Sequence, residues 1–237
     1  MSRNVPNMFE IIVCLANSRK SSGRCIAGKC TDDNSWFRPI SNRAGHEISE
    51  VDRRYSDGQT AQFLDVIGIP CIEERPHGHQ SENVLIDDRF YWEKKGSASW
   101  DDVLELVDQD ADLWENGYSA CYKQNDRVPD GLIDENGGSL RLIELDEMVL
   151  HAGPKAPDFG NMRRIVRASF NYRGQHYKLD VTDPEYERAC LENGAEEYRI
   201  PSVVACISLS EPHTNQNGET FAYKLVASII TKERAGG

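Results

Sequence analysis

The sequence predicts a mainly β protein with minor α content, arranged as small barrels or sandwiches. Short apolar runs bounded by Gly, Pro, Asn and Asp recur along the chain, and each is long enough for one strand. Helical patterns are few. The two halves also look alike, because each contains a basic strand hairpin, a helix-bearing excursion and returning strands, although no residue-level repeat connects them.

The first hairpin occupies the start of the chain. The nearly continuous apolar run Glu10–Ala16 predicts a strand buried on most of its surface. The polar stretch Asn17–Gly23 predicts a hairpin loop, and Gly23–Thr31 the returning strand. Trp36–Ile40 is a third short strand, which Pro39 should limit to a sheet edge.

The elements that follow are less regular. Ala61–Cys71, bent at Gly68 and Pro70, and Glu82–Ile86 predict two more strands. Ser99 is a good N-cap for a helix with an apolar face, since two aspartates follow it in the first turn. The acidic stretch Asp108–Gly138, rich in Asn, Asp and Gly, predicts a loop or linker with at most a helical turn near Trp114.

The second half repeats this order. Leu140–Leu150 predicts a long strand, and Arg173-Gly174 is a two-residue hairpin turn between two further strands. Asp183-Pro184 suits the start of a short helix, with Asp as the cap and Pro at the first helical position. The last two strands should span Val203–Leu209 and Phe221–Thr231.

Composition indicates a globular protein of the cytoplasm. The 237 residues are 39% hydrophobic and 28% charged, without a long apolar span or an apolar leader at the start. The seven cysteines are odd in number and irregularly spaced, which argues against a secreted disulfide framework. We therefore expect a cytoplasmic protein that does not contact a membrane.

Charge is distributed unevenly. The net charge is −12, yet residues 1–45 contain seven Lys or Arg against three acids. Residues 97–150 contain fourteen acids against three basic residues, so the middle of the chain carries most of the negative charge. The overall acidity therefore does not exclude an anionic ligand at either end, although nucleic-acid binders are more often basic.

The segment CLANSRKSSGRCIAGK, followed by WFRPIS and, near the end, YKLVASII, resembles a family of bacterial proteins described as dual OB-fold domains. The resemblance covers about residues 8–232. It implies two five-stranded, OB-like barrels and the usual OB-fold role of binding nucleic acid, and it implies no catalytic residues. We expect the first barrel over residues 1–96, an acidic helix and linker over 97–138, and the second barrel over 139–237.

Two basic and aromatic hairpins are the candidate binding surfaces. Cations can contact phosphates, and aromatic rings can stack on unpaired bases. An alternative is that both hairpins are simply solvated, with Trp36, Phe170 and Tyr172 in the cores. Strand alternation already places Tyr177 on the core side and Lys178 outside. The candidate nucleic-acid-binding residues are Arg19, Lys20, Arg24, Lys29, Trp36 and Arg38 in the first half, and Arg163, Arg167, Tyr172, Arg173 and Lys178 in the second.

Other chemistries have weaker support. Gly23–Cys30 nearly matches a phosphate-binding loop, but Cys30 replaces the hydroxyl residue and the segment predicts a strand. His77 and His79, with Asp87 and Asp88 further on, are fewer closely spaced ligands than a metal site usually has. No nucleophile motif occurs. We expect no cofactor and no bound metal.

The sequence thus favours a non-enzymatic nucleic-acid-binding module. Two alternatives stay open: a metal-dependent hydrolase or nuclease near His77 and His79, and a scaffold whose acidic segment 97–138 binds a protein partner. Both DNA and RNA fit this hypothesis.

Overall fold

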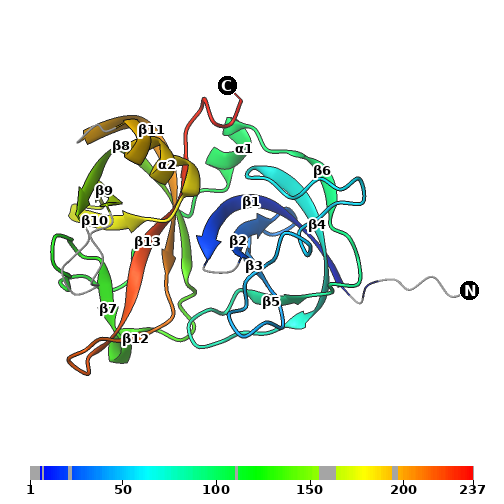
Figure 1. Ribbon diagram of the computed structural model, residues 1–237, viewed down its shortest axis with the longest axis horizontal. Coiled ribbons are helices and arrows are strands. Elements are labelled where there is room, and N and C mark those ends of the chain that lie inside the picture. Colours follow the sequence, from blue (N-terminus) through cyan, green and yellow to red (C-terminus); the bar gives the residue numbers. More distant parts are fainter. Residues whose placement is uncertain are drawn as a thin grey trace, which may run out of the picture.

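The structure is a computed structural model that describes residues 6, 8–20, 23–109, 112–154, 164–193 and 197–236, with only the backbone of residues 19, 20, 154, 164 and 193. It is mainly β, as predicted, and its strands form two sheets that lie side by side (Figure 1). No helix among the described residues is long and apolar enough to span a bilayer.

The first sheet closes into a five-stranded barrel. Its hydrogen-bonded order is β1-β2-β3-β5-β4, and β4 pairs back onto β1. β3 and β5 are parallel, whereas the other neighbours in the ring are antiparallel. A sixth strand, β6, pairs with β4. The strands are β1 (Met8–Lys20), β2 (Gly23–Cys30), β3 (Trp36–Ile40), β4 (Asp65–Glu74), β5 (Asn83–Ile86) and β6 (Glu93–Ser97).

The second sheet repeats this connectivity. Its ring is β8-β9-β10-β13-β11, closed by pairing of β11 with β8, and its one parallel pair is β10 with β13. β7 and β12 add to β13 outside the ring. The strands are β7 (Arg127–Pro129), β8 (Leu140–Pro154), β9 (Arg164–Tyr172), β10 (Gln175–Val181), β11 (Glu197–Leu209), β12 (His213–Thr214) and β13 (Thr220–Ile230). The two rings are therefore the pair of five-stranded, OB-like barrels that the resemblance implied.

Two short α-helices accompany the barrels. α1 (Trp100–Glu105) begins with the predicted cap: the Ser99 hydroxyl accepts from the Asp102 amide at 3.2 Å, and the Asp102 carboxylate accepts from the Ser99 amide at 2.8 Å. α2 (Pro184–Asn193) lies between β10 and β11, and its Cys190 packs into the second core. A 3₁₀ turn, Asp130–Leu132, follows β7.

Several local predictions are confirmed, and two are wrong. Arg173 and Gly174 both have positive φ, as the predicted two-residue hairpin turn requires. The loop predicted from Asn17 is wrong through Lys20, because those residues pair with β2 and continue β1. Pro39 is not at an edge: β3 pairs with β2 at its start and with β5 at its end. In that parallel pair the backbone N–H of Arg38 donates to the Glu82 carbonyl oxygen. The missing N–H of Pro39 therefore removes no hydrogen bond between β3 and β5.

Gly28 explains the near-match to a phosphate-binding loop. It lies inside β2, opposite Cys14 of β1, where a Cβ atom would stand 2.1 Å from the carbonyl oxygen of Val13. The glycine is therefore required for close approach of two strands. The segment is a strand, as predicted, and not a loop that leads into a helix.

A third apolar cluster joins the two barrels, and we call it the seam. β1 contributes Val13 and Leu15, β8 contributes Leu142, and α1 contributes Val103; all four are buried. The Ser228 hydroxyl of β13 also donates to the Leu15 carbonyl of β1. Apolar burial of this kind is typical of a stable interface, since a fully buried Leu or Val contributes about 1.5–3 kcal/mol. The barrels therefore form one packed unit.

The acidic segment is partly absorbed into the second barrel. β7 pairs with β13, and Leu113 lies in the second core. Gln124 exchanges two backbone hydrogen bonds with Lys178 of β10. The segment therefore lies against the gap in the ring where β10 and β13 share only two residue pairs. The boundaries at 96 and 138 stay predictions.

Candidate nucleic-acid interface

The outward face of β2 and β3 carries three of the predicted residues, and it lies against the seam. Lys29 is 4% exposed, and its Nζ donates to the Leu106 carbonyl at 2.7 Å. The same Nζ forms an ion pair with Asp108. The Trp36 Nε1 donates to the Asp108 carboxylate at 3.1 Å, and this carboxylate also accepts from the Leu142 amide at 2.7 Å. One acid of the middle segment therefore holds both side chains and β8 together.

Arg38, on the same face, is 6% exposed and bridges the barrels. Its Nη2 lies 3.0 Å from the Glu82 carboxylate and donates to the Ser139 hydroxyl at 2.7 Å. Ser139 in turn donates its hydroxyl to Glu82. Because the cationic groups of Lys29 and Arg38 face carboxylates inside the protein, they present little charge to solvent. Their predicted role in phosphate contact stays a prediction.

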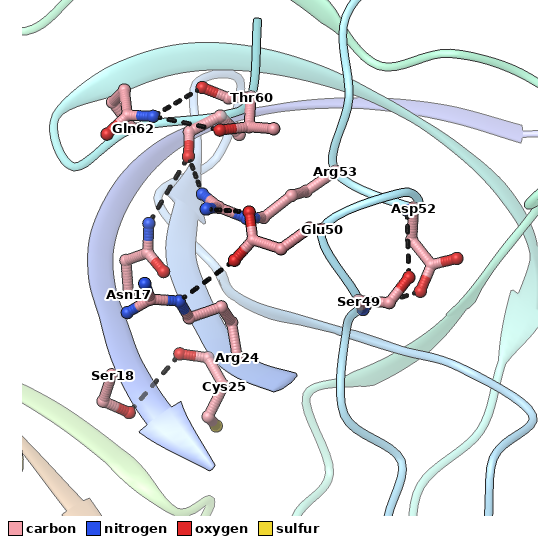
Figure 2. Close-up of polar contacts among 11 residues, drawn as sticks. Asn17, Ser18, Arg24, Cys25, Ser49, Glu50, Asp52, Arg53, Thr60 and Gln62 are labelled. Carbon is pink, nitrogen blue, oxygen red and sulfur yellow. Dashed lines mark hydrogen bonds and ion pairs between the residues drawn. The ribbon is translucent and has the colours of Figure 1, made fainter. Parts of the chain in front are cut away.

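The tip of the first hairpin adds one cation whose side chain is described. Arg24 Nε lies 3.5 Å from Glu50, and the buried Arg53 donates its Nε to the same carboxylate at 3.0 Å (Figure 2). Figure 2 shows Glu50 between the two guanidinium groups. The side chains of Arg19 and Lys20 lie outside the described part of the chain. In the described part, the charge of this tip is thus shared with an acid.

The equivalent strands of the second barrel, β9 and β10, lie on its side away from the first barrel (Figure 1). Their outward residues pair across the strands as His176 with Asn171, Lys178 with Ser169, and Asp180 with Arg167. Together with Arg173 at the turn, we call this surface the β9–β10 face. His176, Asn171 and Arg173 are exposed, and Lys178 is half-buried. This surface is polar throughout.

The core side of the same strands agrees with the predicted alternation. Phe170 and Tyr177 are buried, with ring centroids 5.4 Å apart and nearly parallel planes. Tyr172 is half-buried and packs against that core. Burial raises the pKa of both tyrosines above the ordinary value. Of the aromatic residues in this hairpin, Tyr172 is therefore the one with partly accessible surface.

The cations of the β9–β10 face differ in availability. Arg167 is 4% exposed, with its Nε 3.4 Å from the Asp180 carboxylate, so its guanidinium is held at one end of the face. Arg173 Nε lies 3.5 Å from the well-exposed Asp112. Among the described residues, no acid forms an ion pair with the Lys178 ammonium. Arg163 lies outside the described residues.

Sequence reasoning missed the residues that the middle segment brings beside β10. Lys123 Nζ lies 2.6 Å from Asp180, and Tyr122 next to it is 58% exposed. Arg127, at the start of β7, lies opposite Tyr223 of β13. Arg127 and Tyr223 are 96 positions apart in the sequence, so no local pattern could have joined them.

The histidines considered as metal ligands are not grouped with acids or cysteines. His77 is exposed in a turn, whereas His79 is buried. Within the ranges that the structure describes, no three His, Cys, Asp or Glu side chains gather as ligands of one metal ion.

The chain thus contains two five-stranded rings of the same connectivity, as expected for a pair of OB barrels. The model of the dual OB-containing domain matches residues 11–229 of the chain. The chain belongs to this family. Comparison with curated proteins and with solved structures gives no significant match. OB barrels as a class bind oligonucleotides and oligosaccharides on the face of their second and third strands. In this dual OB protein those strands are β2–β3 and β9–β10.

Proposed function

We propose that this dual OB protein is a nucleic-acid-binding module that holds single-stranded or structured DNA or RNA on the β9–β10 face and catalyses no reaction itself. The observation that carries the proposal is an asymmetry between two barrels of the same connectivity. The β2–β3 face is packed against the seam through Lys29, Trp36 and Arg38. The β9–β10 face contributes nothing to the seam cluster among the described residues.

The chemistry of the β9–β10 face suits a polyanion. Lys178 and Arg173 supply cations for phosphate contacts, while Asn171 and His176 supply further hydrogen-bonding groups. Tyr172 and the exposed Tyr122 offer rings on which bases can stack, and stacking contributes about 1–3 kcal/mol per base. This mode of binding is tolerant of sequence, because every base has a flat face.

Fluorescence anisotropy with labelled single-stranded DNA, single-stranded RNA and duplex tests the proposal at several salt concentrations. The variant Arg173→Glu/Lys178→Glu should lose most of the binding. Each phosphate contact removed should reduce the slope of log K against log salt by about 0.7 for a single strand. The matched control is Arg75→Glu/Lys95→Glu, which makes the same charge change at side chains 41% and 39% exposed on the first barrel. Binding that is independent of salt, or equal losses in both variants, would refute the proposal.

The cysteines support a reducing compartment such as the cytoplasm. All seven are free thiols, and five of them are buried. Burial raises the pKa of Cys14 and Cys71 to about 12. These thiols therefore stay protonated and pack as small apolar groups.

A protein partner that binds the acidic segment 97–138 would be the alternative if no nucleic acid binds.

A further inference from the structure

A cleft of about 650 Å³ lies beside the second barrel, on the outward side of β13. Its walls are the middle segment from Ser119 to Arg127 and the connection from Ser210 to Glu219 that contains β12. Its floor is formed by Tyr223 and Leu225, with Asp180 of β10 at one end. The volume falls within the range of about 300–1,000 Å³ that small-molecule sites usually occupy.

Strand alternation aims the floor residues into the cleft. Lys224 points inward, where its Nζ lies 5.4 Å from the centroid of the core residue Tyr177. Tyr223 and Leu225, its neighbours on β13, therefore point outward. Arg127 lies directly opposite Tyr223 on β7. A flat aromatic side chain and a guanidinium group thus line the same cleft.

The two cations of the cleft are in different electrostatic situations. Lys123 is 5.7 Å from the Tyr223 ring centroid and forms ion pairs with Asp180 at 2.6 Å and Asp126 at 3.4 Å. The Arg127 guanidinium instead stacks 4.1 Å from the Phe221 ring centroid. Its Nε is buried without a hydrogen-bond partner, and no ion pair between described residues includes it. The Arg127 side chain is therefore held against an aromatic ring, and among the described residues no acid neutralises its charge.

We propose that the cleft binds a nucleoside phosphate, either free or as one nucleotide of a bound strand. The phosphate would accept from Arg127, whose planar group can give two parallel hydrogen bonds to it. The base would lie against Tyr223, with the exposed amides of Gln216 and Asn217 available for its polar edge. The strand form of this proposal rests on the proposed function, whereas the free-nucleotide form does not.

The exposed thiol of Cys121 lines the cleft and reports on its occupancy. We expect a nucleoside monophosphate or a short oligonucleotide to slow the reaction of Cys121 with a chromogenic disulfide reagent. The corresponding nucleoside without phosphate should protect at least about tenfold more weakly, because the charge-assisted contact to Arg127 is missing. Calorimetric titration with the same monophosphate measures the affinity directly, whatever the reactivity of the thiol.

Variants separate this site from the β9–β10 face. Arg127→Gln should weaken monophosphate binding about tenfold or more, Arg127→Lys should restore part of it, and Lys178→Glu should leave it unchanged. Oligonucleotide binding that leaves Cys121 unprotected, together with no calorimetric binding of the monophosphate, would overturn the cleft proposal and leave the proposed function standing. Protection of Cys121 by the monophosphate without any oligonucleotide binding would support the cleft proposal and refute the proposed function. Absence of calorimetric binding by both ligands, or equal binding by Arg127→Gln, also refutes the cleft.

Discussion

Removal of one partner from the buried ion pair between Arg38 and Glu82 should destabilise the whole protein. The two groups are 3.0 Å apart, and their side chains are 8% and 4% exposed. In Arg38→Met, the Glu82 carboxylate would keep its contact to Ser139 but lose its counter-charge. We therefore expect this variant to unfold more readily than the double variant Arg38→Met/Glu82→Leu, in which both charges are absent.

The magnitude follows from the burial of the pair. Breaking a buried ion pair by removing one charge costs about 3–5 kcal/mol, whereas replacing both partners with apolar groups is often neutral. For a chain of this size, 1 kcal/mol shifts the unfolding midpoint by about 2–4 °C. Arg38→Met should therefore lower the midpoint by roughly 6–20 °C. The double variant should recover most of that loss, apart from the hydrogen bond of Arg38 to Ser139.

Thermal and urea unfolding, followed by circular dichroism and tryptophan fluorescence, measure both quantities. The two probes should give one coincident transition, because the apolar seam couples the barrels. Arg75→Met is the control, since it removes an arginine whose ion pair with Glu73 is exposed at the surface. If Arg38→Met costs less than about 1 kcal/mol, or the double variant is as unstable as the single one, the assigned role of this pair is wrong.

Three further predictions concern stability. Burial lowers the pKa of Lys224 from 10.5 to about 8, so between these pH values the unfolded chain binds more protons than the folded one, and stability should rise with pH. The difference in unfolding free energy between wild type and Lys224→Met should therefore change by about 3 kcal/mol between pH 7 and 11. A difference that stays constant over this range would contradict the prediction. Gly28→Ala should lower the free energy of urea unfolding by more than about 3 kcal/mol, because the new Cβ meets the backbone of β1. Gly174→Ala is strained only by the positive φ of that residue, so it should lower the same quantity by about 1 kcal/mol. Ser99→Ala should cost about 1 kcal/mol and Ser99→Asp little, as measured by the same unfolding curves.

Features decided by nearby residues could be predicted from the sequence. The Ser99 cap, the Arg173-Gly174 turn and the core-facing alternation of Tyr177 all depend on neighbours in the chain. The loop predicted at Asn17 was wrong because polar composition does not show that a partner strand continues alongside. In Figure 2, Asn17 lies in β1, and its side chain donates to the Ala61 carbonyl, 44 residues away.

The candidate sites were harder to predict, because charge alone does not show where a side chain is buried. Lys29 and Arg38 look like surface cations of a basic hairpin. Their partners, Asp108 and Ser139, lie 79 and 101 residues further along. The cleft could not be predicted either, since β7 has only three residues, too few to show an alternating strand pattern in the sequence. Only the paired backbone of β7 and β13 brings Arg127 beside Tyr223.

The outward residues of each strand explain why the two barrels differ in available surface. Val13, Leu15 and Ala27 are apolar and face the seam from the first barrel, whereas Asn171, His176 and Lys178 of the second barrel are polar and face away from it. A ligand on the β9–β10 face therefore requires no separation of the barrels. Because the seam makes them one cooperative unit, binding at that face should raise the unfolding midpoint of both barrels together by mass action. A ligand that shifted the transition of one barrel alone would show that the seam does not couple them.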